Sequence, residues 1–358
     1  MHHYQKSYKI CDTNLVSKLK NIFLIASPLQ VICAYEFSKK YLAYKNIICP
    51  IYINGADLRN KQIKNTIEFF KFENIENIYI GNSFLSKVNQ IHTVCKFIFL
   101  RLKLGGGNYR LIFGDFRDKS MHIARIFFKP KEAFVIDDGF ASYLAGEKYL
   151  SKSIFLPKLN KFEEFILRIL RHYKYLKDSK VSLFSVYSEL LIGDIFLQND
   201  FLSVRKKIKY KNINYDENLA FYLGTKLSER GALSLDDEIK ILKSSLIYIQ
   251  SIGKKCIYFA KRSTSKKKLD LIEALGYKIY IPEYPLELYL MNSEDLPSLI
   301  CGFGSSVFSN LPKLFPDLKS LILQYPIKVF RKKSDIYEYN TFLEIFKNQP
   351  IEIINIDI

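Results

Sequence analysis

Two adjacent acids are the first residues of this sequence whose position suggests chemistry. Asp137 and Asp138 directly follow an apolar run, residues 133–136, and precede Gly139. A carboxylate held at the end of a strand can act as a general base toward a hydroxyl group. An Asp-Asp-Gly sequence is also typical of a turn, in which the acids bond to nearby backbone. The local sequence leaves both interpretations open.

Two cations end an apolar run in the second half of the chain. Lys261 and Arg262 follow residues 256–260, and a pair of cations at a strand end suits a phosphate or diphosphate group. The alternative is a solvated charge run. We expect that alternative for the lysines at 266–268, which open a predicted helix.

Gly304, Ser305 and Ser306 lie between a predicted strand and a predicted helix. Glycine lets the backbone approach a ligand closely, and the free amides at a helix start favour a phosphate. The spacing matches neither a Walker loop nor a dinucleotide fingerprint. A plainly capped helix start is the alternative interpretation.

The acids, cations and serines described above can act together only in a fold that brings several strand ends close to one another. The hydrophobic pattern of the sequence predicts such a fold. Apolar runs alternate with segments of helical periodicity in both halves of the chain, which indicates an α/β fold with parallel sheets. Ligands bind at the carboxyl ends of strands in such sheets. The predicted strands cover 22–26, 46–54, 74–81, 109–115, 133–136, 219–227, 255–262, 277–282, 298–303 and 318–326.

At 358 residues the chain exceeds the size at which one hydrophobic core stops growing, so we predict two domains. The N-terminal domain is predicted over 1–200, a linker over 201–218 and a C-terminal domain over 219–358. The pattern loosens from about 151 to 215, which we interpret as the inter-domain region. Whether the last helix packs back on the N-terminal domain stays open.

The net charge of +18, from 54 basic and 36 acidic residues, favours an anionic partner. Nucleic acid, an anionic membrane face and an acidic small substrate compete for that role. Nucleic-acid binding is the least favoured, because the lysines are scattered and the aromatic residues lie within apolar patterns. Two basic amphipathic helices, near 87–103 and 161–177, leave membrane contact and a homodimer interface open.

The cysteines and histidines limit the chemistry further. No CxxC pair or metal-ligand spacing occurs, so we expect buried thiols in a reducing compartment and no zinc site. All histidines lie in the first half, which excludes a histidine acid from the second domain. The residues concerned are Cys11, Cys33, Cys49, Cys95, Cys256, Cys301, His2, His3, His92, His122 and His172.

Neither a secretory signal nor a membrane span is predicted. The first twenty residues are interrupted by charges, and no window of 18 residues is apolar throughout. We therefore expect a cytoplasmic protein, with peripheral contact to the inner membrane face left open.

Several segments, taken in order, resemble the bacterial sialyltransferases of glycosyltransferase family 52, which extend lipooligosaccharide or capsule and are similar in layout to polysialyltransferases. The resemblance runs from about residue 21 to 326. It implies a GT-B fold of two Rossmann-like domains facing across a cleft, a CMP-sialic acid donor and no metal or other cofactor. The segments are ASPLQVICAYE, IFGDFRDKSMHIAR, VIDDG, FYLGTKLSE, IYFAKR, YPLELYL and GFGSSVFSNL.

The resemblance also implies roles for individual residues. Asp137 would be the general base, while we expect Asp138 to fix the turn. Ser305 and Ser306 would hold the CMP phosphate, and Glu287 would bind the ribose. Residues of the nucleotide loop and of the acceptor side would be Gly224, Thr225, Ser27, Pro28, Gln30, Asp115 and Arg117.

One departure concerns the leaving group. The family has a His-Pro or His-Arg pair where this chain has Lys261 and Arg262. A lysine can neutralise the departing phosphate, but it holds its proton more tightly than a histidine. We predict an inverting transfer of sialic acid, or another nonulosonic acid, to a surface glycan. A UDP-hexose donor on the same fold is the nearest alternative.

Overall fold

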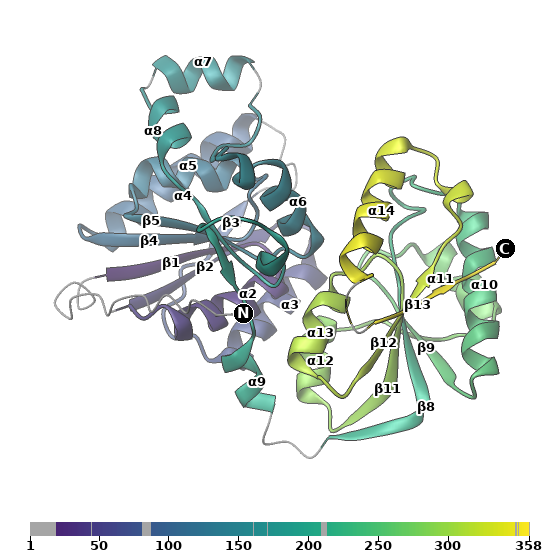
Figure 1. Ribbon diagram of the computed structural model, residues 1–358. Helices are drawn as coiled ribbons and strands as arrows, with labels where there is room; N and C mark the ends of the chain where they lie inside the picture. The colour runs from purple at the N-terminus through teal and green to yellow at the C-terminus, as the bar shows by residue number, and fades with distance from the viewer. Residues whose placement is uncertain are drawn as a thin grey trace, which may run out of the picture. The chain divides into compact units, whose positions relative to one another are not determined.

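The computed structural model describes residues 19–43, 45–80, 87–159, 161–169, 171–208, 213–347, 349 and 351–357. The chain divides into two compact units, Met1–Asn199 and Asp200–Ile358. Each unit contains a parallel β-sheet with helices packed around it (Figure 1). Cys11, His2 and His3 lie outside the described residues.

The first unit is built on a sheet with the strand order β3-β2-β1-β4-β5-β6-β7. All its strand pairs are parallel, and β1 is flanked on both sides, so that Leu24 lies opposite Cys49 of β2 and Phe113 of β4. The strands are β1 Leu19–Ile25, β2 Lys45–Ile53, β3 Ile78–Ile80, β4 Asn108–Phe113, β5 Glu132–Ile136, β6 Ser182–Ser185 and β7 Phe196–Gln198.

Helices follow the first five strands in turn. Their buried faces and the strands form one core, in which β1 is fully buried from Ile22 to Ile25. A strand that is covered on both faces needs a continuous apolar sequence. The apolar run of β1 could therefore be recognised as a strand from the sequence. The helices are α2 Pro28–Lys40, α3 Asp57–Phe70, α4 Lys87–Leu104, α5 Lys119–Phe128, α6 Phe140–Lys148, α7 Lys161–Ile169 and α8 Tyr173–Asp178.

The stretch 151–215, interpreted from sequence as inter-domain, is largely part of the first sheet. Strands β6 and β7 lie within it and extend the sheet beyond β5. They have only four and three residues.

The second unit carries a sheet with the order β10-β9-β8-β11-β12-β13. The predicted linker 201–218 holds α9 and the start of β8, and Asp200 pairs with Lys313 of α13 at 3.6 Å. The strands are β8 Asn214–Leu223, β9 Lys255–Phe259, β10 Lys278–Tyr280, β11 Asp295–Gly302, β12 Lys319–Gln324 and β13 Glu352–Asn355.

The helices of the second unit pack on both sides of its sheet. Phe303, at the end of β11, stacks against Tyr339 and Phe342 of α14, so this last helix is part of the second core. Whether α14 also packs on the first domain stays open. The helices are α9 Leu202–Ile208, α10 Leu235–Ser251, α11 Lys266–Ala274, α12 Leu286–Asn292, α13 Val307–Leu314 and α14 Lys333–Phe346.

The cysteines follow the expectation in part. Cys33, Cys49, Cys256 and Cys301 are buried, whereas Cys95 on α4 is exposed. The prediction of buried thiols is therefore wrong for Cys95.

Candidate active site

Three neighbouring strands of the first unit bring the predicted acceptor-side residues together. Strands β1, β4 and β5 are adjacent and parallel, so their carboxyl ends meet at one edge. Ser27 and Gln30 follow β1, Asp115 and Arg117 follow β4, and Asp138 follows β5. We call these five residues the carboxylate cluster.

Asp138 is the centre of this cluster. Its Oδ1 accepts hydrogen bonds from Gln30 Nε2 at 2.8 Å and from Ser27 Oγ at 3.3 Å. Its Oδ2 lies 3.7 Å from Nη2 of Arg117. The Asp138 backbone N–H donates to Ser142 Oγ at 2.7 Å. One carboxylate oxygen is thus fixed by uncharged donors, while the other has only a long contact to a cation.

The Asp138 carboxylate is accessible and has a shifted pKa. Its side chain is 26% exposed. Partial loss of water raises the pKa of Asp138, and the charge of Asp115 raises it further, against the opposing effects of Gln30, Arg117 and Ser27. A raised pKa makes a carboxylate a stronger base when it is ionised.

Asp137 has a different environment. It is fully buried, and its Oδ2 accepts from the Val186 amide at 2.9 Å and from Asn199 Nδ2 at 3.3 Å. Ser185 Oγ donates to its Oδ1. Burial raises the pKa of Asp137 to about 7, the charge of Asp138 adds to this, and these three hydrogen bonds oppose it.

The environments of the two acids therefore do not match the roles that we expected from the sequence. The buried Asp137 joins β5 to the ends of β6 and β7, and its carboxylate has no surface for a substrate hydroxyl to reach. Asp138, expected to fix the turn, is the one that reaches solvent. Gly139 makes the turn itself, with φ 72° and ψ −147°, a region essentially limited to glycine.

Gly114 is a member of this site that sequence reasoning missed. A Cβ added at Gly114 would lie 1.8 Å from Cδ of Gln30, so any larger residue at the end of β4 must displace the Gln30 side chain. Gln30 is buried and its Oε1 accepts from the Ala26 amide at 2.6 Å, which orients its amide group toward Asp138. Gly114 thereby positions the donor to the candidate base.

The remaining cluster residues shape the loops. Ser27 caps α2, accepting from the Gln30 amide at 3.3 Å, and Pro28 occupies the first turn, as is favoured there. Asp115 holds Arg117 through Nε at 3.0 Å and Nη2 at 2.9 Å. The Arg117 guanidinium is exposed and is held near Asp138 by this pairing.

In the second unit, β9, β8 and β11 are adjacent and parallel. Their ends carry Gly224 and Thr225 after β8, Lys261 and Arg262 after β9, and residues 303–306 after β11. The predicted donor-side residues thus lie along one edge of the second sheet.

Three cations of this edge influence one another. The pKa of Lys261 is lowered by partial loss of water, and the charges of Arg262 and Lys226 lower it further, while Glu287 opposes them. The pKa of Lys226 is lowered by dehydration and by Arg262. All three cations are exposed, so dehydration is partial. Lys226 was missed from sequence, although it directly follows Gly224 and Thr225. We call Lys226, Lys261 and Arg262 the cation group.

A buried ion pair fixes the loop that carries Lys226. Lys268 is fully buried, and its Nζ lies 2.8 Å from Glu238 and 3.1 Å from Glu229. It also donates to the Thr225 carbonyl at 2.9 Å. The expectation of a solvated Lys268 is therefore wrong, because its charge is needed between two acids. Thr225 Oγ1 completes the arrangement by donating to Glu238 at 2.7 Å.

At two positions of this edge the backbone geometry explains why the residue is glycine. A Cβ at Gly224 would lie 2.6 Å from the Tyr258 hydroxyl, so the loop can approach β9 only with glycine. Gly304 has φ 68° and open space around it, so its backbone is left uncovered.

The Gly304-Ser305-Ser306 loop opens α13. Ser305 is buried, and its Oγ accepts from the Val307 amide at 3.4 Å. Ser306 occupies the cap position without a side-chain bond to the helix amides. Ser305 therefore has the capping role here, and Ser306 is the serine whose hydroxyl makes no such bond.

Glu287 lies on α12, where it is 5% exposed. Asn310 Nδ2 of α13 donates to its Oε1 at 2.9 Å. Because Asn310 is itself buried, this bond holds the Glu287 carboxylate at the start of α12. Asn310 is a second positioning residue without a readable signal in the sequence.

Comparison with known proteins adds the fold type. No family model and no curated protein match the sequence. The structure is similar to an α/β-galactoside α-2,3-sialyltransferase from the luminous marine bacterium Photobacterium phosphoreum, with TM-score 0.50 and 14% identity over 94% of this chain and 98% of that one. It is also similar to a putative UDP-N-acetylglucosamine 2-epimerase from Listeria monocytogenes, with TM-score 0.53 and 9% identity over 93% and 89%.

These likenesses and the two parallel sheets confirm the predicted α/β fold of GT-B type, with two Rossmann-like domains. Membership in family 52 stays a prediction. No helix within the described ranges is long and apolar enough to cross a bilayer. Within the same ranges, no three His, Cys, Asp or Glu side chains gather as a metal ligand set.

Proposed function

We propose that this chain is an inverting glycosyltransferase that moves sialic acid, or a related nonulosonic acid, from a CMP donor to a hydroxyl group of a bacterial surface glycan. The observation that carries the proposal is the Asp138 carboxylate, accessible at a strand end and held by Gln30 and Ser27. The similarity in fold to a sialyltransferase supports it.

Asp138 is the general base in this mechanism. Its Oδ2 accepts the proton of the acceptor hydroxyl as that oxygen attacks the anomeric carbon of the donor. The bond between the anomeric carbon and the phosphate oxygen breaks, and its electron pair leaves with CMP. Hydrogen bonds from Gln30 and Ser27 to Oδ1 leave Oδ2 for the incoming proton.

The second unit would stabilise the leaving group. Lys261, Arg262 and Lys226 place positive charge at one strand edge, where charge develops on the CMP phosphate. The Ser306 hydroxyl, which caps no amide of α13, supplies a neutral donor. The buried Glu287 is suited to the ribose hydroxyls, as an acceptor held by Asn310.

A UDP-hexose donor is the second candidate, because the epimerase with a similar fold is named for a UDP-sugar and because Lys261 replaces the histidine of the sialyltransferase pattern. CMP and UDP can be compared by thermal shift, since only the nucleotide of the true donor stabilises the native state strongly. Stabilisation by UDP alone would favour the second candidate.

The direct test is release of CMP from CMP-sialic acid, with and without a lactoside acceptor, for wild type and Asp138→Asn. The expected result is acceptor-dependent release that falls by about 10²- to 10⁴-fold in the variant, with CMP binding retained. Because the proposed reaction uses no metal ion, we expect the activity to be unchanged in the presence of EDTA. Full activity in Asp138→Asn would show that this residue is not the general base. If wild type does not turn over CMP-sialic acid, that compound is excluded as the donor.

A further inference from the structure

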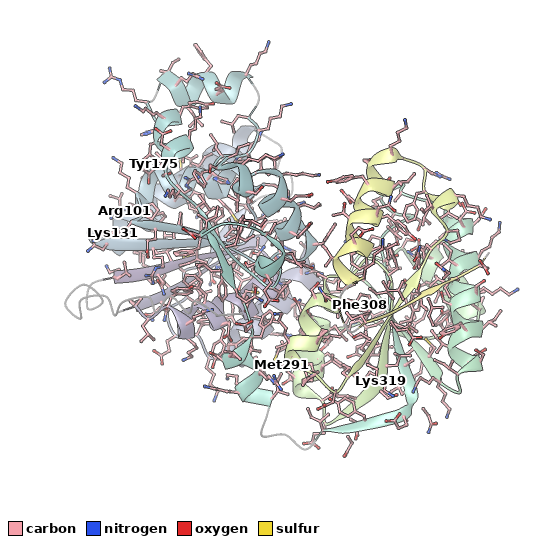
Figure 2. The ribbon with its side chains drawn as sticks, in the orientation of Figure 1. Arg101, Lys131, Tyr175, Met291, Phe308 and Lys319 are labelled. Carbon is pink, nitrogen blue, oxygen red and sulfur yellow. The ribbon has the colours of Figure 1, made fainter. Side chains whose placement is uncertain are left out.

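A polar cavity lies at the amino edge of the first sheet, the end opposite the carboxylate cluster. It has a volume of about 240 Å³ and is formed where β5 and β6 begin, beside α5 and α8. Lys131 and Tyr175, which both line it, are labelled on this side of the unit in Figure 2. Its other polar lining includes Arg125, Glu132, Ser179 and Lys180.

The cavity is positively charged. Lys131 and Lys180 are exposed and form no ion pair with any residue that the structure describes. The one acid of the lining, Glu132, is neutralised by Nε of Arg110 at 2.7 Å. Two ammonium groups at the rim are therefore available to a ligand.

Arg125 adds a buried cation to the cavity wall. It is fully buried, and its guanidinium donates to the carbonyls of Phe155 at 2.7 Å, Ser179 at 2.7 Å and Leu176 at 3.0 Å. Its Nε has no hydrogen-bond partner. In the described part of the chain, no carboxylate pairs with it.

A buried guanidinium surrounded by carbonyls and lacking a counter-ion is costly in free energy. Burial accordingly lowers the pKa of Arg125 to about 10. An anion bound in the adjacent cavity would offset part of this cost. The buried charge of Arg125, which no carboxylate of the described residues compensates, and the two exposed lysines at the rim are separate observations that point to the same ligand charge.

We propose that this cavity binds a phosphate group. Ligand pockets for drug-sized molecules measure roughly 300–1,000 Å³, so about 240 Å³ suits a single small anion rather than a sugar nucleotide. Lys131 and Lys180 donate to the phosphate oxygens from the rim, and Arg125 supplies charge from the wall. The phosphate belongs either to the free ion or to a lipid headgroup.

The test is titration calorimetry of the full chain with inorganic phosphate at constant ionic strength, with chloride as the reference salt. The double variant Lys131→Ala/Lys180→Ala removes two exposed side chains and is expected to bind phosphate at least about tenfold more weakly. The matched control is Lys152→Ala/Lys158→Ala, which removes the same charge from exposed positions of the same unit and should bind as wild type does.

Vesicles of phosphatidic acid in phosphatidylcholine test the second source of the phosphate. Vesicle binding that the double variant loses, without affinity for the free ion, would assign the cavity to a headgroup. Binding of the free ion alone would assign it to a soluble anion.

Three results would overturn the proposal: wild type binds neither probe, the matched control loses as much affinity as the double variant, or only Lys261→Ala loses binding. The last result would place the anion on the cation group of the second unit. Asp138→Asn should bind phosphate normally, so failure of this proposal is separate from failure of the proposed enzyme activity.

Discussion

Replacing Asp137 with asparagine tests whether this acid is structural. Asparagine has the shape of a protonated aspartic acid: its carbonyl can accept from Val186 and Asn199, and its amide can donate to Ser185 Oγ. We therefore expect Asp137→Asn to fold and to keep CMP release within severalfold of wild type. Asp138→Asn, which touches none of these three partners in the structure, should lose it.

The stability of wild type and of Asp137→Asn should depend differently on pH. The pKa of Asp137 is raised from an ordinary value of 3.8 to about 7. Between these values the native state holds the proton and the unfolded state has lost it, so native stability falls as pH rises and then levels above pH 7. About three pKa units correspond to at most about 4 kcal/mol, at roughly 1.4 kcal/mol each. The neutral side chain of the Asp137→Asn variant cannot contribute this slope.

Urea unfolding at several pH values from 5 to 8, followed by circular dichroism, measures the difference. Hydrogen exchange of the β5 amides assigns the transition to the first unit. Asp194→Asn, a change of an exposed acid in the same unit, is the control and should keep the wild-type slope. The reasoning is refuted if Asp137→Asn shows the same pH dependence as wild type, or if wild type gains stability relative to the variant as pH rises.

Three further outcomes follow from the structure. Gly114→Ala should lower turnover at least about tenfold without weakening CMP binding, because its Cβ would lie 1.8 Å from Gln30 and displace the donor to the candidate base; a kinetic assay with a CMP titration checks this. Lys268→Met should lower the free energy of unfolding by about 3–5 kcal/mol, since it leaves a buried carboxylate unpaired, whereas the exposed Lys267→Ala should change it little in urea titrations. Phe99→Ser should weaken salt-sensitive binding to anionic vesicles if α4 is a membrane contact, because Phe99 is 66% exposed; equal binding by wild type and variant would exclude that surface.

The central strands were predictable because burial on both faces demands continuous apolar sequence. Residues 22–25 and 133–136 are apolar and buried throughout. Strands β6, β7 and β13 were missed, and each has three or four residues. Length alone does not explain this, because β3 and β10 have three residues each and were predicted as parts of longer segments, 74–81 and 277–282.

The candidate site was predictable as a set of strand ends, but its internal roles were not. The burial of Lys268 depends on Glu238, which lies thirty positions earlier in the chain and at 2.8 Å in the structure. Lys226 and Gly114 belong to no recognisable sequence motif. Their place in the site depends on their neighbours in the structure, Arg262 for Lys226 and Gln30 for Gly114. Short-range sequence patterns hold no information on such pairings.

The adjacent acids show why the sequence could locate the site but could not assign a role to each of its residues. Successive residues of an extended chain point to opposite sides, so one of two neighbouring acids faces the interior when the other faces solvent. Which one does so is decided by Ser185 and Asn199, 48 and 62 positions away along the chain. Their hydrogen bonds fix the Asp137 carboxylate and with it the backbone from which Asp138 projects. A buried acid that anchors the strand end and an exposed acid that takes the proton are therefore two parts of one arrangement.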